Sequence, residues 1–76
     1  MARKHYEKYS QLSLNIAYYR KKKGLTQEKL AELVGVSRTH ISNIEATKMD
    51  KSLSLDVLFD ISDALGVGVD ALFEIR

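Results

Sequence analysis

The sequence predicts an all-α domain built from five helices. Its apolar residues recur at every third or fourth position rather than at alternate positions, which is the spacing of a helix with one buried face. Proline is absent and only four glycines occur among 76 residues, so few positions interrupt the helices. A chain of this length holds one compact domain and leaves no room for a second.

The composition excludes several classes of protein. The chain has no cysteine, so disulfides and thiolate metal sites are excluded. Its two histidines, His5 and His40, are too few for a zinc site without carboxylate help, and we expect no metal and no cofactor. No Ser, His or Asp falls in a nucleophile motif, so no enzyme is expected. Without a membrane-spanning apolar run or the apolar segment of a signal peptide, the protein is expected to be cytoplasmic.

Charge is distributed unevenly along the chain. Residues 1–23 carry seven Lys or Arg against one Glu, residues 24–51 carry four charges of each sign, and residues 52–76 carry one Arg against five Asp or Glu. A domain polarised in this way would turn its basic end toward a polyanion and its acidic end away from it. A solvated surface with a disordered basic arm is the alternative interpretation of the same charges.

The first helix is expected to begin after a basic arm. Residues 1–10 show no clear apolar period, and we expect a flexible N-terminal arm there, followed by the folded domain over residues 11–76. Three lysines precede Gly24, where they would complement the helix dipole and the glycine would cap the helix. The buried stripe of this helix is predicted to consist of Leu12, Ile16 and Tyr19.

The second and third helices are predicted to meet over a short turn at Gly35. This glycine can end a helix in the left-handed conformation without steric cost, while the Ser37 hydroxyl can cap the next helix. Thr26 is the expected N-cap of the second helix. The buried residues are predicted to be Leu30, Ala31 and Val34 in the second helix and Ile41 and Ile44 in the third. This arrangement is a helix-turn-helix.

The third helix, over residues 38–46, has an unusual outer face. Burial of its two isoleucines places Thr39 and Asn43 outward at about 100° per residue, with Arg38 and Ser42 flanking them. This face is short, polar and uncharged except for Arg38. A helix that is merely solvated usually carries more Lys and Glu, so these side chains favour contacts with the edges of DNA bases.

A fourth helix is expected between Ser54 as N-cap and Gly66 as C-cap. Its exposed face is predicted to carry Asp56, Asp60 and Asp63. Its buried face is predicted to comprise Leu55, Leu58, Ile61, Ala64 and Leu65, with Phe59 as a further candidate. Gly68 is the expected N-cap of a short fifth helix, with Val67 packing on Leu72.

Four features of the chain occur together. Gln27 opens the second helix, Gly35-Val36-Ser37 forms the turn, an Ile-x-x-Ile-Glu run ends at Glu45, and Ala-Leu-Gly-Val occupies residues 64–67. In these features the chain resembles the phage-repressor and Cro-type helix-turn-helix DNA-binding family, over most of its length. The resemblance implies a compact lambda-repressor-like domain that binds double-stranded DNA in the major groove as a transcriptional regulator, either a repressor or an autoregulator.

The resemblance also implies roles for individual residues. Arg38, Thr39 and Asn43 are the expected base-contacting residues. The expected contacts to the DNA backbone are Gln27, Ser37, Ser42, Lys22, Lys23, Lys48 and Lys51. An arginine and a glutamate that pair in this family correspond to Arg20 and Glu45, which we expect to form a structural ion pair. The loop over residues 46–53 departs from the family pattern in composition and is longer than is common, which leaves its path open.

A homodimer on a two-fold operator is expected, because one such helix contacts only a few base pairs. Val69, Phe73 and Ile75 supply apolar surface near the C-terminus and are the expected dimer interface. The same residues would alternatively complete the core. The alternative function is a protein-interaction or antitoxin-type module that uses this fold without contacting bases. No small-molecule ligand is indicated.

Overall fold

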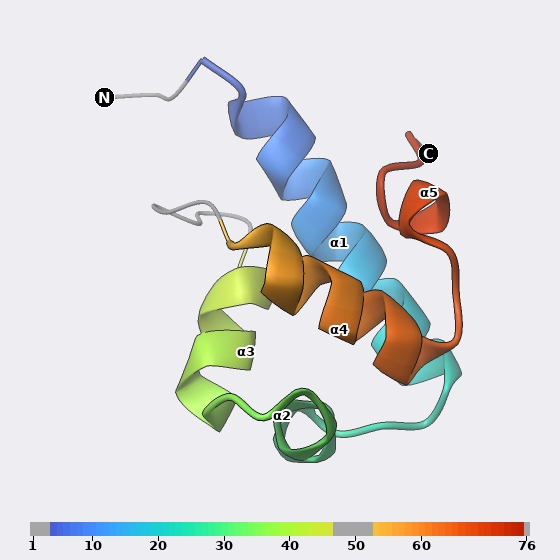
Figure 1. Cartoon of the computed structure of the whole chain (residues 1–76). Coiled ribbons are helices and arrows are strands. Elements are labelled where there is room, and N and C mark those ends of the chain that lie inside the picture. The colour runs from blue at the N-terminus through green and yellow to red at the C-terminus, as the bar shows by residue number, and fades with distance from the viewer. Residues whose placement is uncertain (1–3, 47–52, 76) are drawn as a thin grey trace.

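The computed structural model describes residues 4–46 and 53–75. Over these ranges every regular element is an α-helix, which confirms the predicted all-α class (Figure 1). The helices, in chain order, are α1 (Tyr6–Lys22), α2 (Gln27–Val34), α3 (Arg38–Glu45), α4 (Leu55–Leu65) and α5 (Val69–Leu72).

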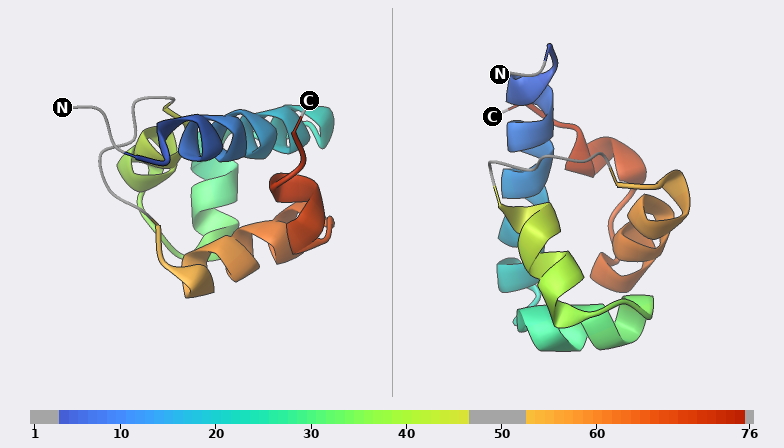
Figure 2. Two further views of the ribbon diagram at one scale, coloured as in Figure 1. Left: turned by 90° about the horizontal axis from the view of Figure 1, so that it is seen from above. Right: turned by 90° about the vertical axis from the view of Figure 1, so that its left-hand side faces the viewer.

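The helices enclose one hydrophobic core. Seen from above, α1 runs along one side of the molecule and α4 along the opposite side, with α3 and α5 near the two ends and α2 between them (Figure 2). Every helix contributes at least one buried apolar side chain to the space they enclose, so no helix is independent of the others. The buried apolar residues are Leu12, Ile16, Leu30, Ala31, Ile41, Ile44, Leu58, Ile61, Leu65 and Leu72.

Local hydrogen bonds and glycines set the ends of the helices. The hydroxyls of Thr26, Ser37 and Ser54 each accept a hydrogen bond from the backbone N–H three residues on, at 3.0, 3.0 and 3.1 Å. Each bond satisfies an N–H that has no partner within its helix. Gly35 and Gly66 end α2 and α4 with φ of 85° and 69°, a conformation that glycine adopts without steric cost. These predictions are confirmed.

The start of α1 differs from the sequence expectation. The helix begins at Tyr6, so residues 6–10 are helical rather than part of a flexible arm. Residues 1–3 lie outside the described residues. Tyr9 is half-buried and extends the apolar stripe of Leu12 and Ile16 by one turn toward the N-terminus. Tyr9 of this turn lines a hollow together with Phe73 and Ile75 of the C-terminal segment.

The buried face of α4 is narrower than predicted. Leu55 was expected in the core, with Phe59 as a further candidate, but the two are 66% and 47% exposed. At about 100° per residue, these two side chains lie roughly 70° and 110° from the centre of the buried face, which places them on its flank. Asp56, Asp60 and Asp63 are exposed, as predicted. The buried residues of α4 are Leu58, Ile61, Ser62 and Leu65.

Two buried helical serines differ in their hydrogen bonding. Among the described residues, the Oγ of Ser13 is the one buried side-chain polar atom without a partner. We expect Ser13→Ala to raise the free energy of unfolding by up to about 1 kcal/mol, because an unpaired buried hydroxyl is unfavourable. Ser62 donates to the carbonyl of Phe59 at 2.9 Å, so Ser62→Ala is expected to lower it by about 1 kcal/mol. Urea unfolding of both variants measures the difference, and an equal loss in both would contradict the expectation.

Candidate nucleic-acid interface

The outer face of α3 presents the three residues expected to contact bases. Arg38, Thr39 and Asn43 are all exposed, while Ile41 and Ile44 on the opposite face are 0% and 2% exposed. The buried pair fixes the rotation of α3 about its axis, and the capped turn before it fixes where the helix begins. The structure therefore presents a fork-shaped cation, a hydroxyl with a methyl group and an amide from one short helix.

Three candidate backbone contacts lie on or beside α3. Ser37 caps α3 with its hydroxyl oxygen and can still donate its own proton to an anion. Ser42 is half-buried on the flank of the helix. Gln27, the first residue of α2, is also half-buried, and its amide bonds to Glu45 at the end of α3. The sequence did not indicate that bond.

Two of the four candidate lysines, Lys22 and Lys23, lie at the C-terminal end of α1 rather than on α3. The Nζ of Lys22 lies 5.7 Å from the centre of the Tyr18 ring. The Nζ of Lys23 lies beside Gly66, where its charge complements the C-terminal end of α4. In Figure 1 this end of α1 lies next to the C-terminal end of α4. Lys48 and Lys51 lie outside the described residues.

A buried polar network joins three helices behind the exposed face of α3. Arg20 donates from Nε and Nη2 to the two carboxylate oxygens of Glu45 at 2.6 and 3.0 Å, and from Nη1 to the carbonyl of Leu25 at 2.7 Å. The amide of Gln27 donates to the same carboxylate at 3.1 Å. The side chains of Arg20 and Glu45 are only 10% and 6% exposed. The expected ion pair is thus present, and it is buried and bidentate.

A second ion pair lies on the surface of α2. The Nζ of Lys29 lies 2.8 Å from the Oε1 of Glu32. Their hydrogen bond, reinforced by the opposite charges, lowers the pKa of Glu32 and raises the pKa of Lys29. Both groups line a hollow of about 550 Å³ that Arg38 also lines. Because the pair is exposed, salt screens it strongly, and we assign it no structural role.

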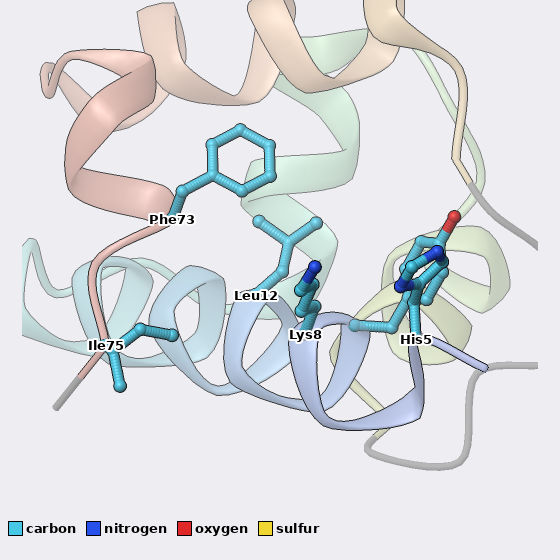
Figure 3. Close-up of a pocket in the computed structure, with 6 residues that line it drawn as sticks. His5, Lys8, Leu12, Phe73 and Ile75 are labelled. Carbon is cyan, nitrogen blue, oxygen red and sulfur yellow. The ribbon is translucent and has the colours of Figure 1, made fainter. Parts of the chain in front are cut away.

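The candidate dimer residues divide into two kinds. Val69 is half-buried and packs against the core, so it helps to complete the domain. Phe73 and Ile75 are 52% and 75% exposed. Both line a hollow of about 500 Å³ between the first turns of α1 and the C-terminal segment (Figure 3). The other residues that line it are His5, Lys8, Tyr9 and Leu12.

A buried amide holds the C-terminal segment against α1. Asn15 is fully buried, and its Nδ2 donates to the carbonyls of Leu72 and Glu74 at 2.9 and 2.7 Å. Its Oδ1 accepts from the Nε2 of Gln11 at 3.0 Å. Asn15 was not among the residues predicted from the sequence. Its position three residues after Leu12, beside the apolar stripe of α1, was the available signal.

Residues 16–72 match the model of the helix-turn-helix family, which is most of the chain. The chain therefore belongs to the helix-turn-helix family, as predicted. It is similar to an uncharacterized HTH-type transcriptional regulator of Methanocaldococcus jannaschii, MJ0272, with 45% identity over 58 residues. That similarity covers 76% of this chain and 85% of the relative.

Two solved structures share the fold. The restriction-modification controller protein C.AhdI from Aeromonas hydrophila has a TM-score of 0.78 at 28% identity, covering 86% of this chain and 96% of that chain. SinR, described as the master regulator for biofilm formation and solved in complex with DNA, has a TM-score of 0.75 at 33% identity. That similarity covers 83% of this chain and 98% of that chain.

Two further observations concern the described residues alone. None of their helices combines the length and apolar character that crossing a membrane requires. Nor do they bring together three side chains of the kinds that bind metal ions.

Proposed function

We propose that this protein is a sequence-specific transcriptional regulator that binds double-stranded DNA through α3. The observation that carries the proposal is the outer face of α3, where Arg38, Thr39 and Asn43 are exposed on a helix anchored by two buried isoleucines. An α-helix of this kind fits the major groove, where each base pair presents a distinct pattern of donors and acceptors. Membership of the helix-turn-helix family and the similarity to SinR, which was solved with DNA, support the proposal.

The three side chains suit different bases. The guanidinium of Arg38 can donate two hydrogen bonds to the O6 and N7 of guanine. The amide of Asn43 can pair with the N6 and N7 of adenine, and the methyl group of Thr39 can contact that of thymine. Loss of one such contact is expected to cost about 1–3 kcal/mol and to relax preference at one position.

Contacts to phosphates would set the position of α3 along the DNA. We assign this role to Gln27, Ser37 and Ser42, which lie on or beside α3. Gln27 is the first residue of α2, where the free backbone N–H groups and the helix dipole favour an anion. Lys22, Lys23, Lys48 and Lys51 remain proposed contributors of positive charge. Loss of a phosphate contact should weaken binding to all sequences alike.

The working species in this proposal is a homodimer on a two-fold operator in the cytoplasm, acting as a repressor or autoregulator. Phe73 and Ile75 are the apolar side chains that a second copy would cover. Val69 packs against the core and supports the segment that carries these two side chains. A dimer would double the contacts that one α3 can make, which a domain of this size needs for operator affinity.

Selection of bound DNA from a random pool tests the assignment of bases. The wild-type protein is expected to yield a two-fold consensus, and Arg38→Ala and Asn43→Ala are each expected to lose preference at one position of every half-site. Lys21→Ala is the control for charge, because Lys21 is an exposed cation at the far end of α1. This variant should keep the consensus unchanged. An unchanged consensus in the Arg38 and Asn43 variants would exclude α3 as the base-contacting helix and favour the protein-interaction module.

Sedimentation equilibrium tests the dimer with a matched pair of variants. Phe73→Asp is expected to raise the dimer dissociation constant at least about tenfold, because a charge would replace an apolar contact at the interface. Phe59→Asp on α4 is the control, since Phe59 is 47% exposed and Phe73 is 52% exposed. This control should leave the dimer intact. A wild-type monomer at high micromolar concentration, with and without DNA, would contradict the dimer.

A further inference from the structure

The amide of Gln27 is attached to the end of α3 before any ligand arrives. Its Nε2 donates to the Oε1 of Glu45 at 3.1 Å. The same carboxylate receives two hydrogen bonds from Arg20, and both charged side chains are almost entirely buried. Glu45 is therefore held rigidly, and it holds Gln27 in turn. This bond connects the first residue of α2 with the last residue of α3, which are 18 positions apart in the sequence.

The bond has a consequence for what Gln27 can offer a ligand. A primary amide carries two N–H donors on one plane, and the bond to Glu45 uses one of them. The second donor then points in a fixed direction from the start of α2. A free glutamine side chain loses much of its rotamer freedom when it is immobilised by a ligand. Here the intramolecular bond removes that freedom beforehand.

Arg20 makes this arrangement compatible with an anion. A carboxylate close to a phosphate would repel it if the carboxylate were unpaired. The guanidinium lies against both oxygens of Glu45 and neutralises the charge at its source. Glu45 can then orient the amide of Gln27 without opposing the ligand that the amide meets.

We infer that Glu45 is a positioning residue for DNA binding, which holds the second N–H of Gln27 toward one phosphate of the operator. The inference rests on the proposed DNA-binding function. Arg20 takes part by neutralising Glu45, and neither charged residue touches the DNA in this role. The fixed relation between α2 and α3 means that the phosphate contact and the base contacts of α3 share one rigid frame.

A double-mutant cycle on operator affinity tests the inference. Arg20→Met/Glu45→Leu removes the anchor without changing the net charge, and apolar replacement of a buried pair is often tolerated. Gln27→Ala is expected to weaken operator binding about fivefold in the wild-type background and less than about twofold in the Arg20→Met/Glu45→Leu background. Equal factors in both backgrounds would overturn the inference, because Gln27 would then act independently of Glu45.

A chemical change in the DNA locates the contact and separates positioning from folding. Operators carrying one uncharged methylphosphonate at each position identify the phosphate whose neutralisation weakens the wild type but not Gln27→Ala. In Arg20→Met/Glu45→Leu that same substitution should lose its effect while the selected consensus stays the same. A retained effect would overturn the inference, since a merely structural role of Glu45 would not remove sensitivity to one phosphate.

The free wild-type protein provides a measurement that needs neither DNA nor a folded variant. Relaxation of the side-chain ¹⁵N amides by NMR should show Gln27 to be rigid and the exposed Asn43 to be mobile. Equal mobility of the two amides would overturn the inference. A rigid Gln27 in a protein that binds no DNA would instead contradict the proposed function and leave the bond to Glu45 in place.

Discussion

Replacing Arg20 with methionine is expected to lower the free energy of unfolding by about 3–5 kcal/mol. The side chain of Glu45 is 6% exposed, and the substitution removes the opposite charge beside its carboxylate. The amide of Gln27 then remains as a hydrogen-bond donor to it. It also removes the donor to the carbonyl of Leu25 in the loop before α2. A domain of 76 residues has a total stability of about 4–11 kcal/mol, so the variant should lose a large share of it.

Thermal unfolding followed by circular dichroism measures this effect, and two further variants interpret it. Adding Glu45→Leu to Arg20→Met should restore most of the stability, because the unpaired buried charge is then gone. Lys29→Met breaks the exposed ion pair with Glu32 and should leave the midpoint unchanged within error. A wild-type midpoint for Arg20→Met itself would mean that the pair is not buried in solution.

Replacing Asn15 with leucine is expected to lower the free energy of unfolding by about 3 kcal/mol. The carbonyls of Leu72 and Glu74 would each lose the hydrogen bond that they accept from Asn15. Leucine has the same number of side-chain heavy atoms in the same branched arrangement, so the substitution leaves no cavity and removes the hydrogen bonds. The C-terminal segment would also lose its attachment to α1, and Phe73 would lose its position at the proposed dimer interface.

Urea unfolding of Asn15→Leu, with Gln11→Leu as the control, measures the contribution of this amide. Gln11 donates only to the Oδ1 of Asn15 in a partly buried bond, so its loss should cost less than about 1 kcal/mol. Sedimentation equilibrium on the folded fraction of Asn15→Leu should report weakened dimerisation. If Asn15→Leu unfolds at the same urea concentration as the wild type, the amide does not hold the C-terminal segment.

The helix boundaries that the sequence predicted correctly depend on local chemistry. The hydroxyls of Thr26, Ser37 and Ser54 bond to N–H groups three residues away, and the glycines that end α2 and α4 need only their own backbone freedom. Such features lie within a short window of sequence. The start of α1 lacks such a local signal, because residues 1–10 show no clear apolar period.

The same distinction applies to exposure in α4. The helical wheel correctly gives the order of residues around the helix, but it does not say how far the neighbouring helices extend. Leu55 was placed inside because it is apolar, and Phe59 was a further candidate, yet the packing surface of α4 ends before it reaches them. Where one element ends depends on the tertiary arrangement, which the pattern within that element does not contain.

The exposed side chains of the candidate site were predictable from the sequence. The outward position of Arg38, Thr39 and Asn43 follows from the period of a helix and the two isoleucines of α3. The pairing of Arg20 with Glu45 was expected from the family resemblance. The bonds of Gln27 and Asn15 were not predictable, because their partners lie 18, 57 and 59 residues away in the sequence.

The attachment of the C-terminal segment to Asn15 has a consequence during synthesis of the chain. The carbonyl of Leu72 is added 57 residues after Asn15, which corresponds to about 3–11 s of translation. Throughout that interval the amide of Asn15 lacks the carbonyls of the C-terminal segment, and the core lacks Leu72. The nascent chain can form its first helices early, but the ribosome must deliver α5 before the domain can close.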